Sequence, residues 1–350
     1  TIIEGEKAFY SCDALARVTL GSGLTIVPKS AFRYCSAIKT LTLGSNITKI
    51  DEYAFQGCSA LTALSIPKSV TSIEYCAFED CKAIKSITIP GTAKSLGSYA
   101  FKNCDAATSL TLKSGIETIG YQAFYSCDLI SSVTIPNSVT YLGEGVFEYC
   151  TSVTKAVIGT GITTIPKNAF RYCSNMTSLT IGKNVVTIGE YAFQWCSSIT
   201  SVTIPDSVVT VDYCAFEGCS AMSTLTVGNG VTGLGSYVFK NCDSLTTVKL
   251  GNSLTGISYQ AFYDCDVLKG IVIPDSVTNI DSEAFYGCDV LSSVIVGDGV
   301  TTISDQAFRN CPSLSNIYLG ENLTNIGYRA FYECTGLKNV YYGASKSYWG

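Results

Sequence analysis

The sequence contains no histidine and little charge, and both absences narrow the possible functions. Of 350 residues, 23 are Lys or Arg and 28 are Asp or Glu, which makes 15% charged residues and a net charge of −5. Without His the chain cannot form a Ser-His-Asp triad, a His general base or a His-ligated metal site. It also lacks the clustered Lys and Arg that bind nucleic acid phosphates. The composition therefore predicts a non-enzymatic protein with no cofactor, no metal and no nucleic acid partner.

Long hydrophobic runs are missing as well. No apolar stretch approaches the roughly 18 residues that a membrane span needs, although 47% of the residues are hydrophobic. We expect no membrane span in this segment and a large apolar core instead. The chain starts at Thr1, inside a repeat and without an initiating Met or a signal sequence, which indicates a processed chain or an excised fragment.

What the sequence has in excess is cysteine at a fixed spacing of 23 residues. The regular positions run from Cys12 and Cys35 to Cys334 without a slip, and a Phe stands three residues before each of them. Units this short cannot bury their apolar side alone, but stacked copies bury one another. We expect a single repeat array over 1–350, with a partial first repeat at 1–11, fourteen full repeats over 12–333 and a partial last repeat at 334–350.

One copy, residues 127–150, predicts the local structure. Val133-Thr134-Ile135 is β-branched and alternates with period two, which is typical of a short strand, and Pro136 ends it. Residues 139–142 form a second extended piece, and the Ala-Phe pair before most cysteines predicts a single helical turn. The expected fold is a solenoid of about fifteen repeats, mainly β, with parallel stacked strands and short helical turns.

A longer period overlies the first. The residue that directly follows each regularly spaced Phe recurs six repeats, or 138 residues, later in five of six positions. Cys76, which stands outside the regular cysteine positions, recurs as Cys214. A six-repeat block was therefore copied whole.

These residues resemble the BspA-like family of leucine-rich-repeat cell-surface proteins. The positions that carry the resemblance in one repeat are Leu61, Leu64, Ile66, Pro67, Ser69, Val70, Thr71, Ile73, Ala77, Phe78 and Cys81. The match extends over practically the whole chain, and Trp349 looks like part of the element that closes such arrays. The resemblance implies a leucine-rich-repeat solenoid, an extracellular or cell-surface location, and binding to proteins or glycoproteins of host matrix or of another cell.

The cysteines could form disulfides or hold metal, but a ladder of equivalent residues favours neither. Adjacent rungs place their Cβ atoms about 4.8 Å apart with parallel directions, whereas a disulfide needs about 3.8 Å and converging directions. We expect buried, inert thiols. Cys76 and Cys214 are the better candidates for exposure among the cysteines, although a packing role is favoured for both. Residues 228–233 match G-x-G-x-x-G, but in a turn between short strands this motif does not predict a nucleotide site.

The outward position of each first strand changes character along the chain. It is mostly threonine up to Thr226, which leaves an ice-binding array as a remote alternative. It then becomes apolar and aromatic and predicts a contact surface bordered by polar groups. The residues of this predicted binding stripe are Lys249, Val272, Ile295, Asn316, Tyr318, Asn339 and Tyr341. The alternative is that a following domain or cap covers them.

A second aromatic cluster consists of Tyr149, Tyr172 and Trp195, each just before a ladder cysteine. It suits a glycan platform or, better, packing between rungs. Taken together, the sequence predicts a non-enzymatic extracellular binding or adhesion module. The alternative from another class is a structural subunit that self-associates end to end into a surface filament, because solenoid ends expose strand edges.

Overall fold

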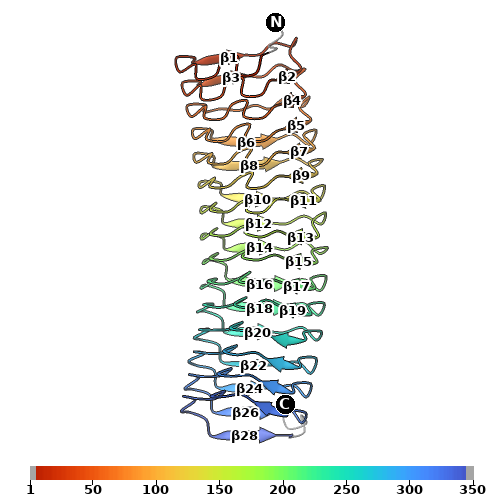
Figure 1. The fold of residues 1–350 in the computed structure, drawn as a ribbon, viewed down its shortest axis with the longest axis vertical. Coiled ribbons are helices and arrows are strands. Elements are labelled where there is room, and N and C mark those ends of the chain that lie inside the picture. Colours follow the sequence, from red (N-terminus) through yellow and green to blue (C-terminus); the bar gives the residue numbers. More distant parts are fainter. Residues whose placement is uncertain (1–4, 344–350) are drawn as a thin grey trace. The chain divides into compact units, whose positions relative to one another are not determined.

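The computed structural model of the chain describes residues 5–343, which form a parallel-strand β-solenoid. Trp349, the predicted closing residue, lies outside the described residues. The chain divides into two compact units, Thr1–Met176 (unit 1) and Thr177–Gly350 (unit 2), and each is described by itself (Figure 1).

Unit 1 contributes up to two short strands from each repeat. The first strands are β1 (Arg17–Thr19), β3 (Thr40–Thr42), β6 (Ser86–Ile89), β8 (Ser109–Leu112), β10 (Ser132–Thr134) and β12 (Lys155–Val157). The second strands are β2 (Ile26–Val27), β4 (Lys49–Ile50), β5 (Ser72–Ile73), β7 (Ser95–Leu96), β9 (Thr118–Ile119), β11 (Tyr141–Leu142) and β13 (Thr164–Ile165). Paired strands are parallel, and their partners lie one repeat apart, as in Val18 with Leu41.

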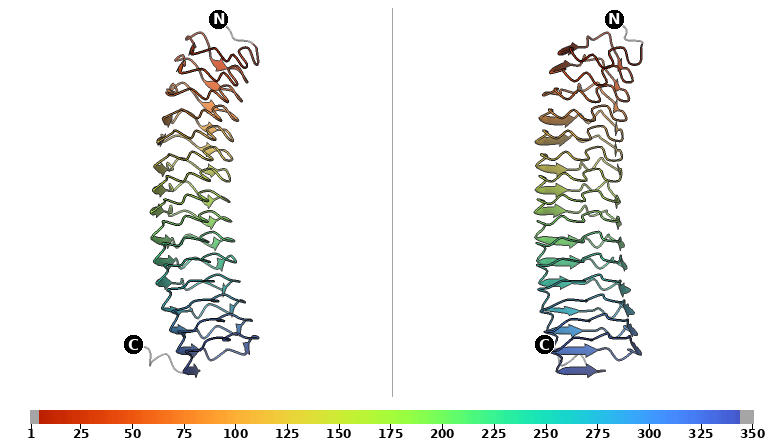
Figure 2. Two further views of the ribbon diagram at one scale, coloured as in Figure 1. Left: turned by 90° about the vertical axis from the view of Figure 1, so that its left-hand side faces the viewer. Right: turned by 60° about the vertical axis from the view of Figure 1, so that its left-hand side comes forward.

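Unit 2 has the same two series. Its first strands are β14 (Ser178–Thr180), β16 (Ser201–Ile204), β18 (Thr224–Val227), β20 (Thr247–Lys249), β22 (Gly270–Val272), β24 (Ser293–Ile295), β26 (Asn316–Leu319) and β28 (Asn339–Tyr342). Its second strands are β15 (Thr187–Ile188), β17 (Thr210–Val211), β19 (Gly233–Leu234), β21 (Gly256–Ile257), β23 (Asn279–Ile280), β25 (Thr302–Ile303) and β27 (Asn325–Ile326). Figure 2 shows the strands of each series stacked within their unit.

The apolar side chains of each strand point inward because side chains alternate between the two faces of a strand. In β6, Ile87 and Ile89 are buried while Ser86 and Thr88 are exposed. The expected pattern of buried β-branched residues and exposed hydroxyl residues is therefore confirmed.

A continuous stack of phenylalanines fills the core of each unit. In unit 1 neighbouring rings from Phe9 to Phe170 lie 5.1–5.7 Å apart between centroids and within 19° of parallel. In unit 2 the stack from Phe193 to Phe331 has spacings of 5.0–5.8 Å. Parallel rings at this separation are offset, which is the arrangement that aromatic quadrupoles favour.

The segment before each cysteine differs from the prediction, because it is a chain of turns and no helix occurs among the described residues. The amides of Ala31, Arg33 and Cys35 bond three residues back in their own repeat. The alternate amides of Ser30, Phe32 and Tyr34 bond instead to carbonyls of the next repeat at 2.7–2.9 Å. Ser30 and Tyr34 have φ of 55° and 61°. A helix would bond every amide within its own segment, so the link to the next repeat replaces it.

Candidate functional site

The cysteine ladder is buried in its interior and accessible at its two ends. All seventeen cysteines are free thiols, and fifteen of them are buried, the exceptions being the exposed Cys12 and the half-buried Cys334. Burial raises the pKa of Cys58 and that of Cys219 to about 12, so these groups stay protonated at neutral pH and are poor nucleophiles. The prediction of buried thiols is confirmed for the interior of the array, and their inertness stays a prediction.

The two stray cysteines are buried as well, each with 3% of its surface exposed. Both occupy backbone positions of positive φ, 52° at Cys76 and 53° at Cys214. Burial, followed by a hydrogen bond with Glu79, raises the pKa of the Cys76 thiol. Of the two interpretations that the sequence left open, exposure is wrong and packing is correct.

The predicted binding stripe lies on the outward face of the first strands of unit 2. Val272 pairs in register with Ile295 in β24, Ile295 pairs with Tyr318 in β26, and Tyr318 pairs with Tyr341 in β28. Lys249 is the last residue of β20, and its side chain is exposed. The 23-residue period brings these residues to neighbouring rungs, which the sequence alone predicts.

The aromatic end of the stripe is ordered by stacking and hydrogen bonding. The rings of Tyr318 and Tyr341 lie 4.7 Å apart at an angle of 10°. Beside them the amide of Asn339 donates to the side-chain oxygen of Asn316 at 2.8 Å, and Asn316 donates to the hydroxyl of Ser315 at 2.9 Å. The two aromatic rings thus stand next to a fixed row of polar groups.

The apolar end of the stripe borders a pocket that the sequence did not reveal. Val272 is 58% exposed, and together with Ile295 it lines a pocket of about 370 Å³. Asn252, Pro274 and Asp275 supply other parts of the wall. The turn that follows each strand forms this pocket, and its shape depends on backbone geometry that residue spacing does not report.

The row of outward threonines on the first strands is interrupted within unit 1. Thr88 pairs with Thr111, both exposed, but Thr134 pairs with Val157. Many hydroxyls that stand just before the second strands of both units are engaged in bonds between repeats, such as that from Thr255 to the carbonyl of Thr232 at 2.9 Å. Ice binding stays a remote prediction, to be tested by thermal hysteresis.

The second aromatic cluster contributes to packing between rungs. Tyr149 and Tyr172 stack at 4.7 Å and 16°, and the guanidinium of Arg171 lies 4.7 Å from the ring of Tyr172. In unit 2 the ring of Trp195 lies so close to Gly218, whose φ is +71°, that a Cβ there would collide with it.

Other classes of site find little support within the described chain. Residues 228–232 form the turn between β18 and β19, Gly233 begins β19, and no helix follows them. Residues 5–343 hold no group of three or more acidic or cysteine side chains suited to a metal ion, and no helix among them could span a membrane.

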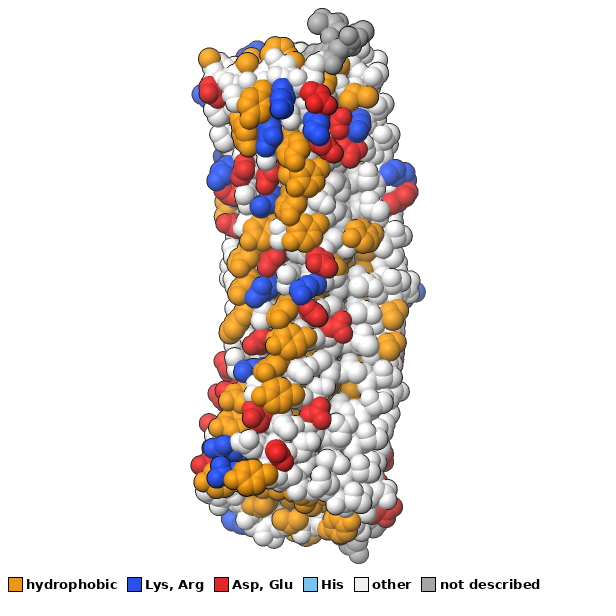
Figure 3. Space-filling model, in the orientation of Figure 1, with side chains coloured by type: hydrophobic (Ala, Val, Ile, Leu, Met, Phe, Trp, Pro, Cys, Tyr) orange, Lys and Arg blue, Asp and Glu red, His pale blue; other side chains and the backbone are white. Residues whose placement is uncertain are grey.

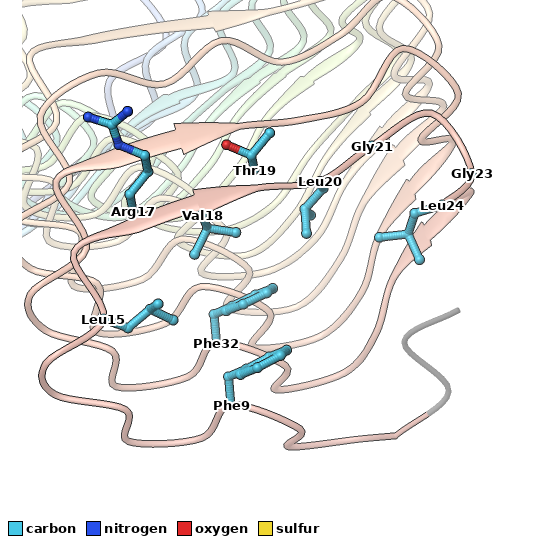
Figure 4. A pocket seen from close by; sticks show the side chains of 10 residues that line it. All are labelled: Phe9, Leu15, Arg17, Val18, Thr19, Leu20, Gly21, Gly23, Leu24 and Phe32. Carbon is cyan, nitrogen blue, oxygen red and sulfur yellow. The ribbon is translucent and has the colours of Figure 1, made fainter. Parts of the chain in front are cut away.

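The N-terminal end of unit 1 carries a pocket of about 400 Å³. Figure 4 shows the stacked rings of Phe9 and Phe32 in it, with Val18 directed toward them. Phe9 is 40% exposed, whereas Phe32 is 2% exposed. The pocket therefore presents side chains that interior repeats bury against their neighbours.

The comparison with protein families decides the identity of this solenoid. The family of the BspA type leucine rich repeat region (6 copies) matches residues 2–104, 76–197, 163–289 and 255–348. The chain belongs to this BspA-type leucine-rich-repeat family. The predicted resemblance and fold are thus confirmed, and leucine-rich-repeat proteins of this kind generally bind proteins.

Solved structures agree with this assignment. A leucine-rich repeat protein from Bacteroides ovatus is 31% identical, with a TM-score of 0.81 over 91% of this chain and 82% of its own. A leucine rich cell surface protein from Faecalibacterium prausnitzii is 25% identical, with a TM-score of 0.51 over 100% of this chain and 84% of its own. The pneumococcal vaccine antigen PcpA shares the fold at 22% identity, with a TM-score of 0.51 over 86% of this chain and 74% of its own. A search of curated proteins finds no match.

Proposed function

We propose that the chain is a non-enzymatic binding module displayed outside the cell, and that the binding stripe of unit 2 contacts its partner. The observation that carries the proposal is the stacked pair Tyr318 and Tyr341, held beside the bonded amides of Asn316 and Asn339. Aromatic residues with a polar border are typical of protein interfaces, where a few of them supply most of the binding energy.

The partner class that suits this surface is a large protein or glycoprotein of host matrix or of another cell surface. The stripe crosses successive first strands of unit 2, from β20 to β28, so it offers a broad contact area. Membership of the BspA-type family supports this partner class, and the F. prausnitzii relative, itself a cell surface protein, supports the location.

Capture by immobilised plasma and matrix glycoproteins tests the proposal. The double variant Tyr318→Ala/Tyr341→Ala should bind at least tenfold more weakly with an unchanged melting temperature. The matched control is Tyr141→Ala, a strand tyrosine of unit 1 that is 57% exposed. Equal capture of the double variant and the unmodified chain would exclude the stripe as the binding site. If no glycoprotein of the panel captures the chain, this partner class is excluded.

The pocket of unit 1 favours a second candidate, end-to-end self-association. Val340 is 58% exposed and Ile326 is 48% exposed, whereas Ile317 and Ile303 at the same repeat positions are fully buried. A second copy that continued the stacking would cover these residues together with Phe9. Such a head-to-tail interface does not close on itself and produces filaments.

Sedimentation across a hundredfold range of concentration tests this candidate. We expect polymers that grow with concentration and that Val340→Asp abolishes. Monomers at every concentration would contradict it.

A further inference from the structure

Each unit carries a ladder of four tyrosines on the turns that precede the cysteines, outside the binding stripe. The members of the two tyrosine quartets are Tyr53, Tyr75, Tyr99 and Tyr121 in unit 1, and Tyr191, Tyr213, Tyr237 and Tyr259 in unit 2. Each member of the second quartet stands 138 residues after its counterpart, so the six-repeat duplication copied the whole set. Figure 3 shows hydrophobic side chains gathered in lanes with charged groups between them.

The geometry of the quartets is as regular as their spacing. In unit 1 neighbouring rings meet edge to face at 5.2–5.5 Å and 73–82°. In unit 2 they meet at 5.2–5.3 Å and 73–87°. Tyr53 and Tyr99 have positive φ whereas Tyr75 and Tyr121 do not, and this alternation of the backbone turns successive rings across one another.

Polar side chains that directly follow the phenylalanines of the repeats form hydrogen bonds and ion pairs beside each quartet. In unit 1, Gln56 donates to Glu79 at 2.6 Å, and Glu79 pairs with Lys102 at 3.5 Å. The ammonium group of Lys102 lies 5.1 Å from the ring of Tyr99. In unit 2, Gln194 donates to Glu217 at 2.6 Å, and the ammonium group of Lys240 lies 5.1 Å from the ring of Tyr237. The rings are thus held in place before any partner arrives.

In unit 1 the more exposed rings are two repeats apart. Tyr75 and Tyr121 are 38% and 39% exposed, while Tyr99 between them is half-buried. In unit 2, Tyr213 is 39% exposed, and Tyr259, two repeats later, is half-buried. In the same three repeats of unit 1, Phe78, Phe101 and Phe124 are spaced by 5.1 and 5.7 Å between ring centroids, so equivalent rings two repeats apart lie about 11 Å apart.

We propose that each tyrosine quartet binds a proline-rich peptide in the polyproline II conformation, laid along the stack of repeats. Polyproline II has three residues per turn and a rise of 3.1 Å per residue, so one face of it repeats every ~9.3 Å. This repeat is within about 2 Å of the two-repeat separation and closer to it than that of an extended strand, so successive turns of the peptide can meet Tyr75 and Tyr121 in unit 1. An extended strand repeats its side chains every ~6.7 Å and falls out of step. Rigid aromatic surfaces recognise proline-rich segments in other proteins because such peptides lose little entropy on binding.

Charge distinguishes the two quartets. Glu74, beside Tyr75, lies 3.9 Å from the ammonium group of Lys49. Its counterpart in unit 2 is Asp212, beside Tyr213, and Thr187 stands where unit 1 has Lys49. Among the described residues no ion pair engages Asp212. The unit 2 quartet therefore complements a proline-rich peptide that carries Arg or Lys.

Two labelled peptides, dodecaproline and a (Pro-Pro-Arg)₄ peptide, test the proposal with the full chain by calorimetry and fluorescence anisotropy. We expect two dodecaproline sites per chain. The double variant Tyr75→Ala/Tyr121→Ala should remove the unit 1 site, and Tyr213→Ala/Tyr259→Ala should remove the unit 2 site. In each variant the remaining site reports that the protein is folded. Tyr141→Ala should leave both. The Arg-containing peptide should favour the unit 2 site at least threefold, and Asp212→Asn should abolish that preference while leaving dodecaproline binding unchanged.

Three results would overturn the proposal: no peptide binding at millimolar concentration, binding that neither double variant changes, or a neutral polysaccharide that binds the quartets in place of the peptides. The test is independent of the binding stripe, because Tyr318 and Tyr341 belong to neither quartet.

Discussion

The thiol of Cys58 donates a hydrogen bond to the backbone carbonyl of Phe32, 3.2 Å away and one repeat earlier. The same carbonyl accepts the amide of Cys35 at 3.2 Å. The contact recurs along each unit, for example from Cys127 to Phe101 at 3.1 Å. The ladder cysteine is thus a small apolar side chain with one weak donor, directed at an acceptor in the preceding repeat.

Replacing Cys58 with Ala should lower the free energy of unfolding by about 1–3 kcal/mol, because the change removes the donor and leaves a small cavity. Urea unfolding followed by circular dichroism measures the loss. Cys12→Ala is the control, since Cys12 is exposed, and it should change stability by less than ~0.5 kcal/mol. Equal losses at the two positions would contradict a structural role for the contact.

Ellman's reagent should distinguish the ends of the ladder from its interior. In the native protein we expect rapid reaction of Cys12 and slower reaction of Cys334, and the other fifteen thiols should react only in denaturant. Cys12→Ser should remove the rapid phase. Rapid reaction of Cys76 or Cys214 would show that these residues are not packed as described.

Alkaline pH should destabilise the solenoid. Burial raises the pKa of Cys219 from 9.0 to about 12, so its contribution to stability is complete below pH 9. That contribution is lost as the pH rises toward 12, because the unfolded chain ionises first. Melting temperatures measured between pH 8 and pH 11 should fall, and Cys219→Ala should make the fall shallower. A flat profile over this range would contradict the burial of these thiols.

The phenylalanine stack should be most sensitive in its interior. Phe124 is fully buried between Phe101 and Phe147, and Phe124→Ala should cost about 3–5 kcal/mol. The 40% exposed Phe9 has a single described ring neighbour, so Phe9→Ala should cost much less. Chemical denaturation of the two variants side by side gives the comparison, and similar losses would be inconsistent with a stack that ends at Phe9.

Much of this architecture follows from periodicity alone. The 23-residue spacing of Phe and Cys predicts two ladders, parallel strands and the register of Val272, Ile295 and Tyr318, and all of these are present. The turns before the cysteines are not predictable in this way, because Ala-Phe also suits a helix. Only the bonds to the next repeat and the positive φ at positions such as Ser30 exclude one.

The candidate site also has features that residue spacing predicts and features that it does not. Spacing places Tyr318 beside Tyr341, but it reports neither the pocket at Val272 nor the burial of Cys76. Both depend on where the turns direct the backbone. Turns with positive φ are not marked by a periodic pattern of apolar residues, so the sequence does not reveal them. The role of the stripe in binding stays a prediction that the proposed variants test.

The bonds that join each repeat to the next also determine how such a gene can change length. Because Phe32 bonds to Ala54 as Phe55 bonds to Ala77, removing or adding 23 residues restores the same partners at the junction. An insertion of one residue restores none of them. Recombination between copies can therefore lengthen or shorten the protein in whole rungs without an intermediate that fails to fold, and the copied 138-residue block is one product of that freedom.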